Sequence, residues 1–303
     1  MAYHADVRLH SRDRAVVRTL IALAVVALGA LVGCTEKTPF AGLAEARRRA
    51  AELQVEFTRA ADAGNRAVMA DTDEASAAYA REARTATDAV QKKADALGAV
   101  LNEFGFSQEA GQLEDFRPKL AEYRALDRTI LDLAVENTNL KAQRLSFGDA
   151  RTAADAFRDA VTAVVPANQA RDLWRVRALG ATAVASVREI QALQAPHIAE
   201  ADEAAMKSLE KQMAAAEAGA RRALSDLDGL ARPGSRPQLA AATAQLSRFM
   251  QLNAEIVALS RRNTNVRSLA LSLNQKRALT ASCEASLQTL RESLDKRSFA
   301  GTR

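Results

Sequence analysis

The sequence is poor in the residues on which most enzyme chemistry depends. Its 303 residues include two cysteines, three histidines and one tryptophan, and aromatic residues make up 4% of the chain. Two of the histidines lie within the first ten residues, which leaves only His197 for the folded part. From this inventory we can assemble neither a Ser/His/Asp set nor a His/Cys/acid cluster with metal-ligand spacing. We therefore predict a protein that is not an enzyme and has no metal or other cofactor.

Glycine and proline are also scarce, with 13 and 6 residues respectively. From residue 43 onward the chain is rich in Ala, Leu, Glu, Arg, Gln and Lys, a composition typical of long helices. The 42 basic and 37 acidic residues give a net charge of only +5 and are mixed along the chain, as on a solvated helical surface. The sequence therefore predicts an all-α fold and no binding of nucleic acid.

The N-terminal segment resembles the signal peptide of a bacterial lipoprotein. A stretch with four arginines precedes an apolar run at 20–32, which is shorter than the ~20 residues that a spanning helix needs. The run ends in Leu31-Val32-Gly33-Cys34. In that class of protein the leucine and the small residue before the cysteine fit the signal peptidase, and the cysteine sulfur then receives a diacylglyceryl group.

This resemblance implies that residues 1–33 are removed, that 34–42 form a linker, and that lipidated Cys34 holds the protein to a membrane. Each buried CH₂ of an acyl chain contributes about 0.8 kcal/mol, so two or three chains anchor firmly. We expect a bacterial envelope location on the periplasmic side. Thr35 follows the cysteine in place of an aspartate, which favours the outer over the inner membrane. The alternative is that Cys34 is an ordinary small residue in an uncleaved anchor.

Once Cys34 is lipidated, Cys283 is the single cysteine left, and an internal disulfide is excluded. Cys283 is then either a buried small residue in a helix or the site of an intermolecular disulfide.

The chain carries an internal duplication. Two apolar seams with spacings of three and four residues, typical of coiled coils, are related by an offset of 126. Residues 131–140 align with 257–266 at this offset, and residues 69–76 align with 198–205 at an offset of 129. The seams consist of Phe116, Leu120, Tyr123, Ile130, Leu133, Asn137 and Leu140, and of Leu246, Phe249, Leu252, Ile256, Leu259, Asn263 and Val266.

We interpret the repeats as two helical hairpins, one at about 43–165 and the other at about 167–298. Loops are expected at 102–115 and 232–235, where glycine and proline gather. Four helices of ~55–60 residues, each ~85 Å long, would then form one elongated antiparallel four-helix bundle over 43–298.

Polar residues interrupt both seams at matching positions. Asn137 and Asn263 occupy seam positions, and equal distances from the two loops place them at one level, beside the 73–76 and 202–205 segments. Buried amides either fix register by bonding to one another or to a neighbour, or line a polar pocket between helices. The pocket interpretation takes in Asn137, Thr138, Asn139, Asn263, Thr264 and Asn265.

Two further residues have a structural and a functional interpretation. His197 continues an apolar stripe, so we expect a core histidine with satisfied hydrogen bonds, and the alternative is a ligand contact or pH switch. Trp174 is expected to pack at the end of the bundle.

The paired hairpins, the seams at Leu120/Tyr123 and Leu246/Phe249, and the repeated Asn-Thr-Asn segments resemble the periplasmic sensory domain of methyl-accepting chemotaxis receptors. The resemblance implies a dimeric four-helix bundle that binds amino or organic acids between helices near the end far from the membrane, often through arginines. No arginine can be matched by motif. The chain also departs from that family because it has neither the transmembrane helices nor the cytoplasmic signalling hairpin.

Two functions remain open at this stage. The first is a lipid-anchored, sensor-like module that binds a small solute or an envelope receptor, alone or as a homodimer. The second is a structural lipoprotein whose bundle serves as a spacer or scaffold in the envelope.

Overall fold

The computed structural model describes residues 38–167 and 172–298, and within these ranges the chain is helical and contains no strand. The all-α prediction is therefore confirmed. Leu31, Val32, Gly33 and Cys34 lie outside the described residues. In chain order the elements are α2 (Pro39–Met69), α3 (Asp73–Glu103), α4 (Ser107–Glu136), α5 (Thr138–Leu145), the π-helical turn η1 (Ser146–Ala150), α6 (Arg151–Ala167), α7 (Leu173–Ala199), α8 (Glu203–Leu230), the 3₁₀ turn η2 (Pro233–Ser235), α9 (Arg236–Arg262), α10 (Thr264–Leu271), the π-helical turn η3 (Ser272–Lys276) and α11 (Arg277–Lys296).

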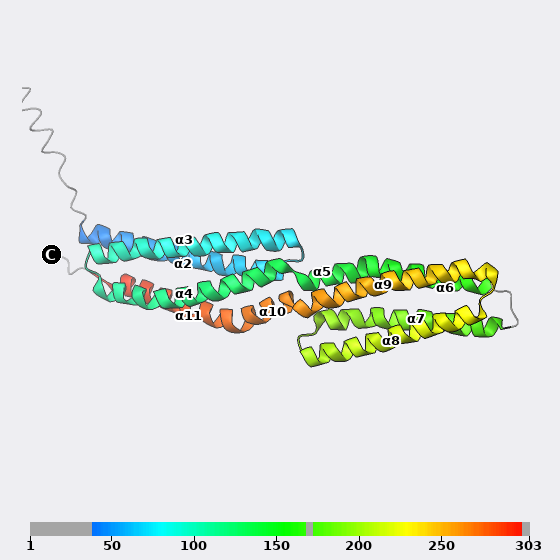
Figure 1. Cartoon of the computed structure of the whole chain (residues 1–303). Helices are drawn as coiled ribbons and strands as arrows, with labels where there is room; N and C mark the ends of the chain where they lie inside the picture. Colours follow the sequence, from blue (N-terminus) through cyan, green and yellow to red (C-terminus); the bar gives the residue numbers. More distant parts are fainter. Residues whose placement is uncertain (1–37, 168–171, 299–303) are drawn as a thin grey trace, which may run out of the picture.

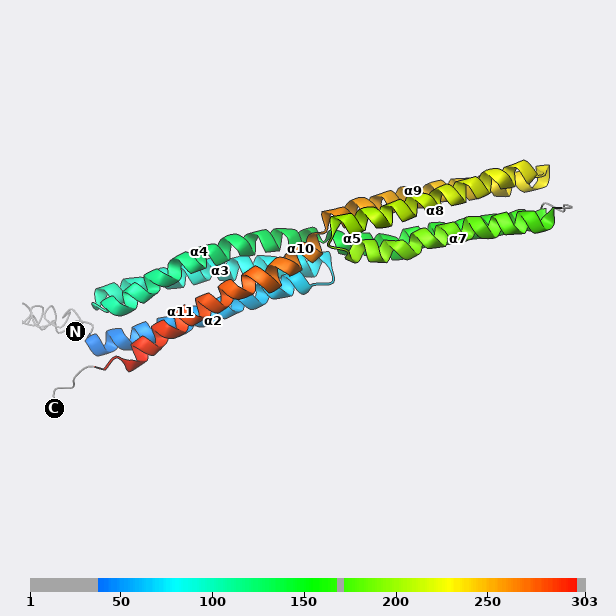
Figure 2. The same cartoon turned by 90° about the horizontal axis from the view of Figure 1, so that it is seen from below.

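The helices form two bundles placed end to end, as Figures 1 and 2 show from two sides. Bundle 1 contains α2, α3, α4 and the α10–η3–α11 segment, and it holds the first and last described residues at its outer end. Bundle 2 contains the α5–η1–α6 segment, α7, α8 and α9. The two long segments, 107–167 and 236–296, each run through both bundles and are shared by them.

This arrangement corrects the prediction of a single four-helix bundle with four helices of equal length. The error lies in the segments 70–72 and 200–202, which we expected inside long helices and which are hairpin turns. The turns contain no glycine or proline and depend on side-chain caps. The side chains of Thr72 and Asp202 accept hydrogen bonds from the amides of Ala75 and Ala205 at 3.1 and 2.8 Å, which satisfies one open donor at each helix start.

The order of structural elements repeats along the chain. Each half has a short hairpin followed by a long, interrupted helix, and the π-helical turns at 146–150 and 272–276 are 126 positions apart. For the hairpins the structural offset is 130, because Asp73 and Glu203 are the first residues of α3 and α8. The sequence alignment at 129 was therefore shifted by one residue.

The two bundles have different apolar cores. In bundle 1 three aromatic rings meet, with Phe57 lying 5.1 Å from Tyr123 and 6.3 Å from Phe116 between ring centroids. In bundle 2 the core is built mainly from small and aliphatic residues around Phe157 and Phe249. The cores are separate clusters, so the contact between the bundles consists of something other than a continuous apolar seam.

The structure tests two predictions about single residues, Cys283 and Trp174. Cys283 is a fully buried free cysteine, as expected for a small core residue, and burial raises the pKa of its thiol to about 12. Trp174 is 69% exposed, so the prediction that it packs at a bundle end was wrong.

None of the described helices combines the length and the apolar character that a bilayer crossing needs.

The repeat supplies a matched pair of core substitutions. Leu120 and Leu246 are equivalent, and both are at most 1% exposed. We expect Leu120→Ala and Leu246→Ala each to lower the free energy of unfolding by about 2–5 kcal/mol, because each leaves a cavity in a packed core. Urea unfolding followed by circular dichroism measures this. A loss below about 1 kcal/mol for either variant would contradict the packing described.

Candidate functional site at the junction of the bundles

The junction forms where both long helices break at an asparagine. Asn137 and Asn263 have backbone φ values of 50° and 52°, in the left-handed region, and they are the only non-glycine residues with positive φ in the described part of the chain. Asparagine is among the few residues that adopt this conformation readily, because its short side chain bonds locally. Each break ends one helix and leaves open amide groups at the start of the next, α5 or α10.

The two broken helices cap each other. The Thr138 amide donates to Thr264 Oγ1 at 3.1 Å, and the Thr264 amide donates to Thr138 Oγ1 at 3.2 Å. One residue further on, the amides of Asn139 and Asn265 donate to each other's side-chain Oδ1, both at 3.1 Å. A residue and its own repeat copy therefore meet across a local two-fold axis, and each satisfies the helix start of the other.

Amide side chains extend this network to the hairpin turns. Asn139 Nδ2 donates to Asn263 Oδ1 at 2.9 Å and to the carbonyl of Ile198 at 2.6 Å. Asn263 Nδ2 donates to the carbonyl of Glu200 at 2.8 Å. On the other side of the axis Asn265 Nδ2 donates to Asn137 Oδ1 at 2.8 Å. The junction thus ties the end of α7 to both long helices.

The symmetry of the network fails at one atom. Asn263 Nδ2 has the Glu200 carbonyl as its acceptor, whereas the buried Nδ2 of Asn137 has no partner among the described residues. The asparagine of bundle 1 is therefore less well satisfied than its copy.

At the surface of the junction, an ion pair joins two residues at equivalent positions of the two repeats. Arg262 Nη2 lies 2.8 Å from Glu136 Oε2. Both side chains are about half exposed, so the pair contributes little to stability.

The structure brings the six candidate residues Asn137, Thr138, Asn139, Asn263, Thr264 and Asn265 together, and the 73–76 segment and the turn before residue 203 lie beside them. Ser76 Oγ donates to the carbonyls of Ala67 and Ala134 at 3.1 and 3.0 Å. The bonds among the six residues are those of a register-fixing cluster. Their role in binding a ligand stays a prediction.

A second polar cluster, next to the junction in bundle 2, was predicted only in part. His197 is fully buried, with Nδ1 lying 2.8 Å from Ser260 Oγ and Nε2 lying 2.9 Å from Glu210 Oε1. This confirms a core histidine with both ring nitrogens bonded. Arg261 donates two hydrogen bonds to the same carboxylate, both at 2.7 Å, and chiefly for this reason the pKa of Glu210 falls to about 2.

Sequence reasoning missed two buried polar groups at equivalent places in the two bundles. In bundle 2, Ser146 Oγ donates to Gln194 Oε1 at 2.7 Å, and Gln194 Nε2 donates to Asn253 Oδ1 at 2.9 Å. In bundle 1 an ion pair takes this place, with Lys276 Nζ lying 2.5 Å from Asp127 Oδ1 and both side chains at most 3% exposed. Burial raises the pKa of Asp127 even beside this lysine. The available signal was a charged residue at seam spacing, four residues after Tyr123.

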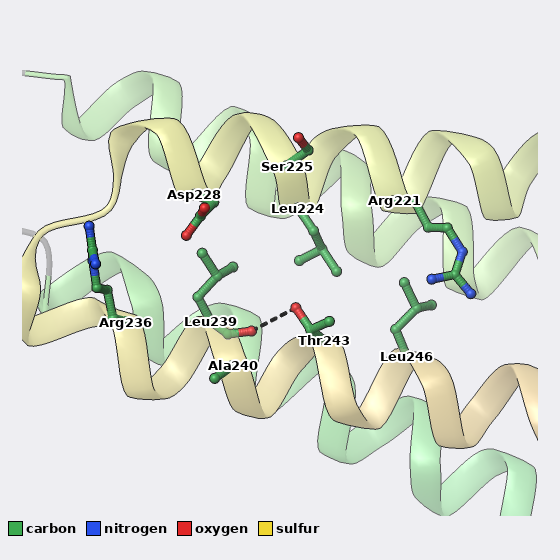
Figure 3. A pocket seen from close by; sticks show the side chains of 9 residues that line it. All are labelled: Arg221, Leu224, Ser225, Asp228, Arg236, Leu239, Ala240, Thr243 and Leu246. Carbon is green, nitrogen blue, oxygen red and sulfur yellow. Dashed lines mark hydrogen bonds between the residues drawn. The ribbon is translucent and has the colours of Figure 1, made fainter.

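A pocket of about 520 Å³ opens between α8 and α9, toward the far end of bundle 2. Figure 3 shows Leu224, Leu239 and Leu246 on its inner side. Thr243 Oγ1, also shown there, donates to the Leu239 carbonyl at 3.0 Å. The charged residues at the pocket are Arg221, Asp228 and Arg236. None of the six junction residues lines this pocket.

Comparison with known proteins gives one weak structural similarity. The crystal structure of the sensor domain of the histidine kinase TorS from V. parahaemolyticus aligns over 84% of this chain and 97% of its own chain, with 13% sequence identity and a TM-score of 0.42. No protein-family model and no curated protein matches the sequence.

Substitution of the two asparagines tests the junction. Alanine in the left-handed region costs about 1–2 kcal/mol, and each lost hydrogen bond costs about 0.5–1.5 kcal/mol. We expect Asn263→Ala to destabilise more than Asn137→Ala, because Asn263 both accepts and donates a side-chain bond whereas the Nδ2 of Asn137 is unpartnered. Glycine at either position should recover the backbone part of the loss. Equal unfolding midpoints in urea for the alanine and glycine variants would refute the backbone assignment.

The Glu210 cluster predicts a pH dependence of stability. Because the pKa of Glu210 is lowered from 4.5 to about 2 in the folded protein, its stabilising contribution is complete above pH 4.5 and is lost as the pH falls toward 2. Allowing for solvent screening, this amounts to about 1–2 kcal/mol. Glu210→Gln should remove that part of the slope in thermal unfolding between pH 5 and 2, and Glu255→Gln, at an exposed carboxylate of α9, should leave the slope as in the wild type.

Proposed function

We propose that the chain is a non-enzymatic envelope lipoprotein, anchored through Cys34, whose two-bundle rod is a sensor-like module that binds a small charged solute or an envelope partner. The observation that carries this proposal is the pocket between α8 and α9. Ligand sites in helical bundles are concave, largely apolar and fitted with a few polar groups, and this pocket has leucines inside and charged side chains around them.

The charges at the pocket favour a particular class of solute. Two arginines, Arg221 and Arg236, and one carboxylate, Asp228, line it. Arginine binds carboxylates in a bidentate geometry, and an aspartate is a partner for an ammonium group. The set therefore suits an amino acid or a dicarboxylate, and the resemblance to chemoreceptor sensory domains implies amino or organic acids as ligands.

The shared long helices provide a route from this pocket to the anchored end. The segment 236–296 begins beside the pocket, passes the junction and ends in bundle 1 next to the first described helix, α2. A change in the packing of α9 would thus be transmitted to bundle 1 along the segment 236–296 and through the polar junction.

A structural scaffold is the second candidate, and the junction favours it. All four capping amides of Thr138, Asn139, Thr264 and Asn265 are satisfied within the protein. A closed, mutually bonded cluster suits a spacer that holds two bundles in line.

Ligand binding and scaffolding are separated by thermal unfolding against a panel of amino acids and dicarboxylic acids. A specific ligand at 100 times its Kd stabilises the folded state by about 2.7 kcal/mol, which raises the unfolding temperature. We expect Arg236→Ala to abolish the increase and Arg222→Ala, an exposed arginine of α8 outside the pocket lining, to retain it. No increase with any compound would leave the scaffold as the better function.

Anchoring is tested by labelling cells with radioactive palmitate. We expect label in the wild-type protein and none in Cys34→Ala, which should also be released from the membrane fraction. Equal labelling of the two proteins would disprove the anchor.

A further inference from the structure

His197 lies near the end of α7, where that helix meets the junction. The last carbonyl groups of a helix have no donor within the helix itself. Here Ser260 Oγ, from α9, donates to the carbonyl of His197 at 2.8 Å, next to the carbonyls of Ile198 and Glu200 that the junction asparagines bind. The position of the turn that follows α7 therefore depends on side-chain donors from the two long segments.

The hydroxyl group of Ser260 has a single proton for two close contacts. Ser260 Oγ lies 2.8 Å from the carbonyl oxygen of His197 and 2.8 Å from Nδ1 of the same residue. A separation of 2.8 Å between two oxygens is typical of an O–H···O hydrogen bond, and the carbonyl oxygen has no proton of its own. The hydroxyl proton therefore points to the carbonyl, and Nδ1 must itself have a proton to donate to Ser260 Oγ.

The other copy of the repeat satisfies the same carbonyl in the same way. In bundle 1 the equivalent positions are three buried alanines, Ala67, Ala80 and Ala134 in place of His197, Glu210 and Ser260. Ser76 Oγ, from α3, donates to the carbonyl of Ala67 at 3.1 Å. A serine hydroxyl thus binds this carbonyl in both bundles, and bundle 1 forms without the histidine and the carboxylate.

The second ring nitrogen of His197 faces a carboxylate. Nε2 lies 2.9 Å from Glu210 Oε1, and Arg261 donates two hydrogen bonds to the same carboxylate, both at 2.7 Å. Chiefly because of Arg261, the pKa of Glu210 is lowered to about 2. Glu210 is therefore ionised at neutral pH and can only accept hydrogen bonds, so Nε2 must also have a proton.

The charged groups that face the ring come from α8 and α9. They are Glu210 of α8 and Arg261 of α9. Glu203, also of α8, interacts electrostatically with Arg261 and is paired with Lys207. The basic side chains of α5, which also contacts α7, bond to groups of bundle 1 and are Lys141 and Arg144. Glu210 is therefore the counter-ion that a charged ring would share with Arg261.

We infer that His197 is an imidazolium in the folded protein and that its second proton holds the end of α7 to α8 and α9. Loss of the proton from Nδ1 turns the Ser260 hydroxyl toward the ring and frees the His197 carbonyl. Loss of the proton from Nε2 sets a nitrogen lone pair against the Glu210 carboxylate. Either loss removes a contact beside the junction, so the α7–α8 turn loosens as the pH rises. This pH-sensitive contact is independent of the pocket and of the anchor proposed above.

NMR of the ring nitrogens tests the protonation state, with the full-length protein labelled with nitrogen-15 histidine and kept in non-ionic detergent. An imidazolium has two protonated nitrogens with similar chemical shifts, whereas a neutral ring has one protonated and one bare nitrogen with well-separated shifts. We expect two protonated nitrogens for His197 at pH 7.5. In concentrated urea at the same pH the ring should be neutral, because an unperturbed histidine loses its proton at about pH 6.5. His197→Gln identifies the signal among the three histidines.

Matched variants test the two acceptors. Glu210→Gln removes the charge opposite Nε2, and Ser260→Ala removes the acceptor of Nδ1. Each variant should give a neutral His197 ring at pH 7.5. Glu255→Gln, at an exposed carboxylate of α9, should leave both ring nitrogens protonated.

Hydrogen exchange of two equivalent turns tests the contact itself. The α7–α8 turn, residues 199–204, follows His197, whereas the α2–α3 turn, residues 69–74, follows Ala67. Exchange is measured by mass spectrometry at pH 6.5 and pH 9 and corrected for the intrinsic rate at each pH. We expect the protection of the 199–204 turn to fall severalfold at the higher pH, and that of the 69–74 turn to stay the same.

Two results would overturn the inference. One is a bare ring nitrogen on His197 in the folded wild-type protein at pH 7.5, and the other is an equal pH dependence of protection, including none, in the two turns. Both measurements are made on the wild-type protein, so they remain decisive even if a variant does not fold.

Discussion

The reciprocal capping of two broken helices is the constraint on which the architecture depends. A long helix that stops at a left-handed residue exposes amides that are costly to bury without acceptors. Here Thr138 and Thr264, followed by Asn139 and Asn265, supply those acceptors to each other. Neither break is well satisfied without its counterpart. The polar junction therefore replaces a continuous apolar core as the connection between the bundles and fixes their register.

Much of this architecture could be predicted from residue patterns, and the failures have definite physical causes. Helical composition, the duplication and the convergence of the Asn-Thr-Asn segments were all readable, because periodicity and repeats are local in the sequence. The turns at 70–72 and 200–202 were not, because they contain no glycine or proline and the helices after them begin at side-chain caps, Thr72 and Asp202. Without these two turns, α2 and α3 are predicted as one long helix, and so are α7 and α8. The prediction then contains one four-helix bundle in place of two.

The candidate sites show the same limit. The junction was found because its residues repeat at a fixed offset, whereas Lys276 was missed because its copy is Ala150 and breaks the repeat. At equivalent places in their cores both bundles contain polar atoms. Bundle 2 has a neutral hydrogen-bond network there, and bundle 1 has an ion pair. Comparing the two repeats identifies a residue such as Lys276 only after the structure has shown which positions of the two repeats are equivalent.

The contacts of residues with their own copies also bear on the origin of the fold. Such contacts require a two-fold axis, and in a chain with a single repeat they can form only between two identical subunits. The present protein has the geometry of an ancient homodimer joined into one polypeptide. Two halves of one chain, unlike two identical subunits, can differ in sequence, and here one half holds a charged pair in its interior where the other holds an uncharged network.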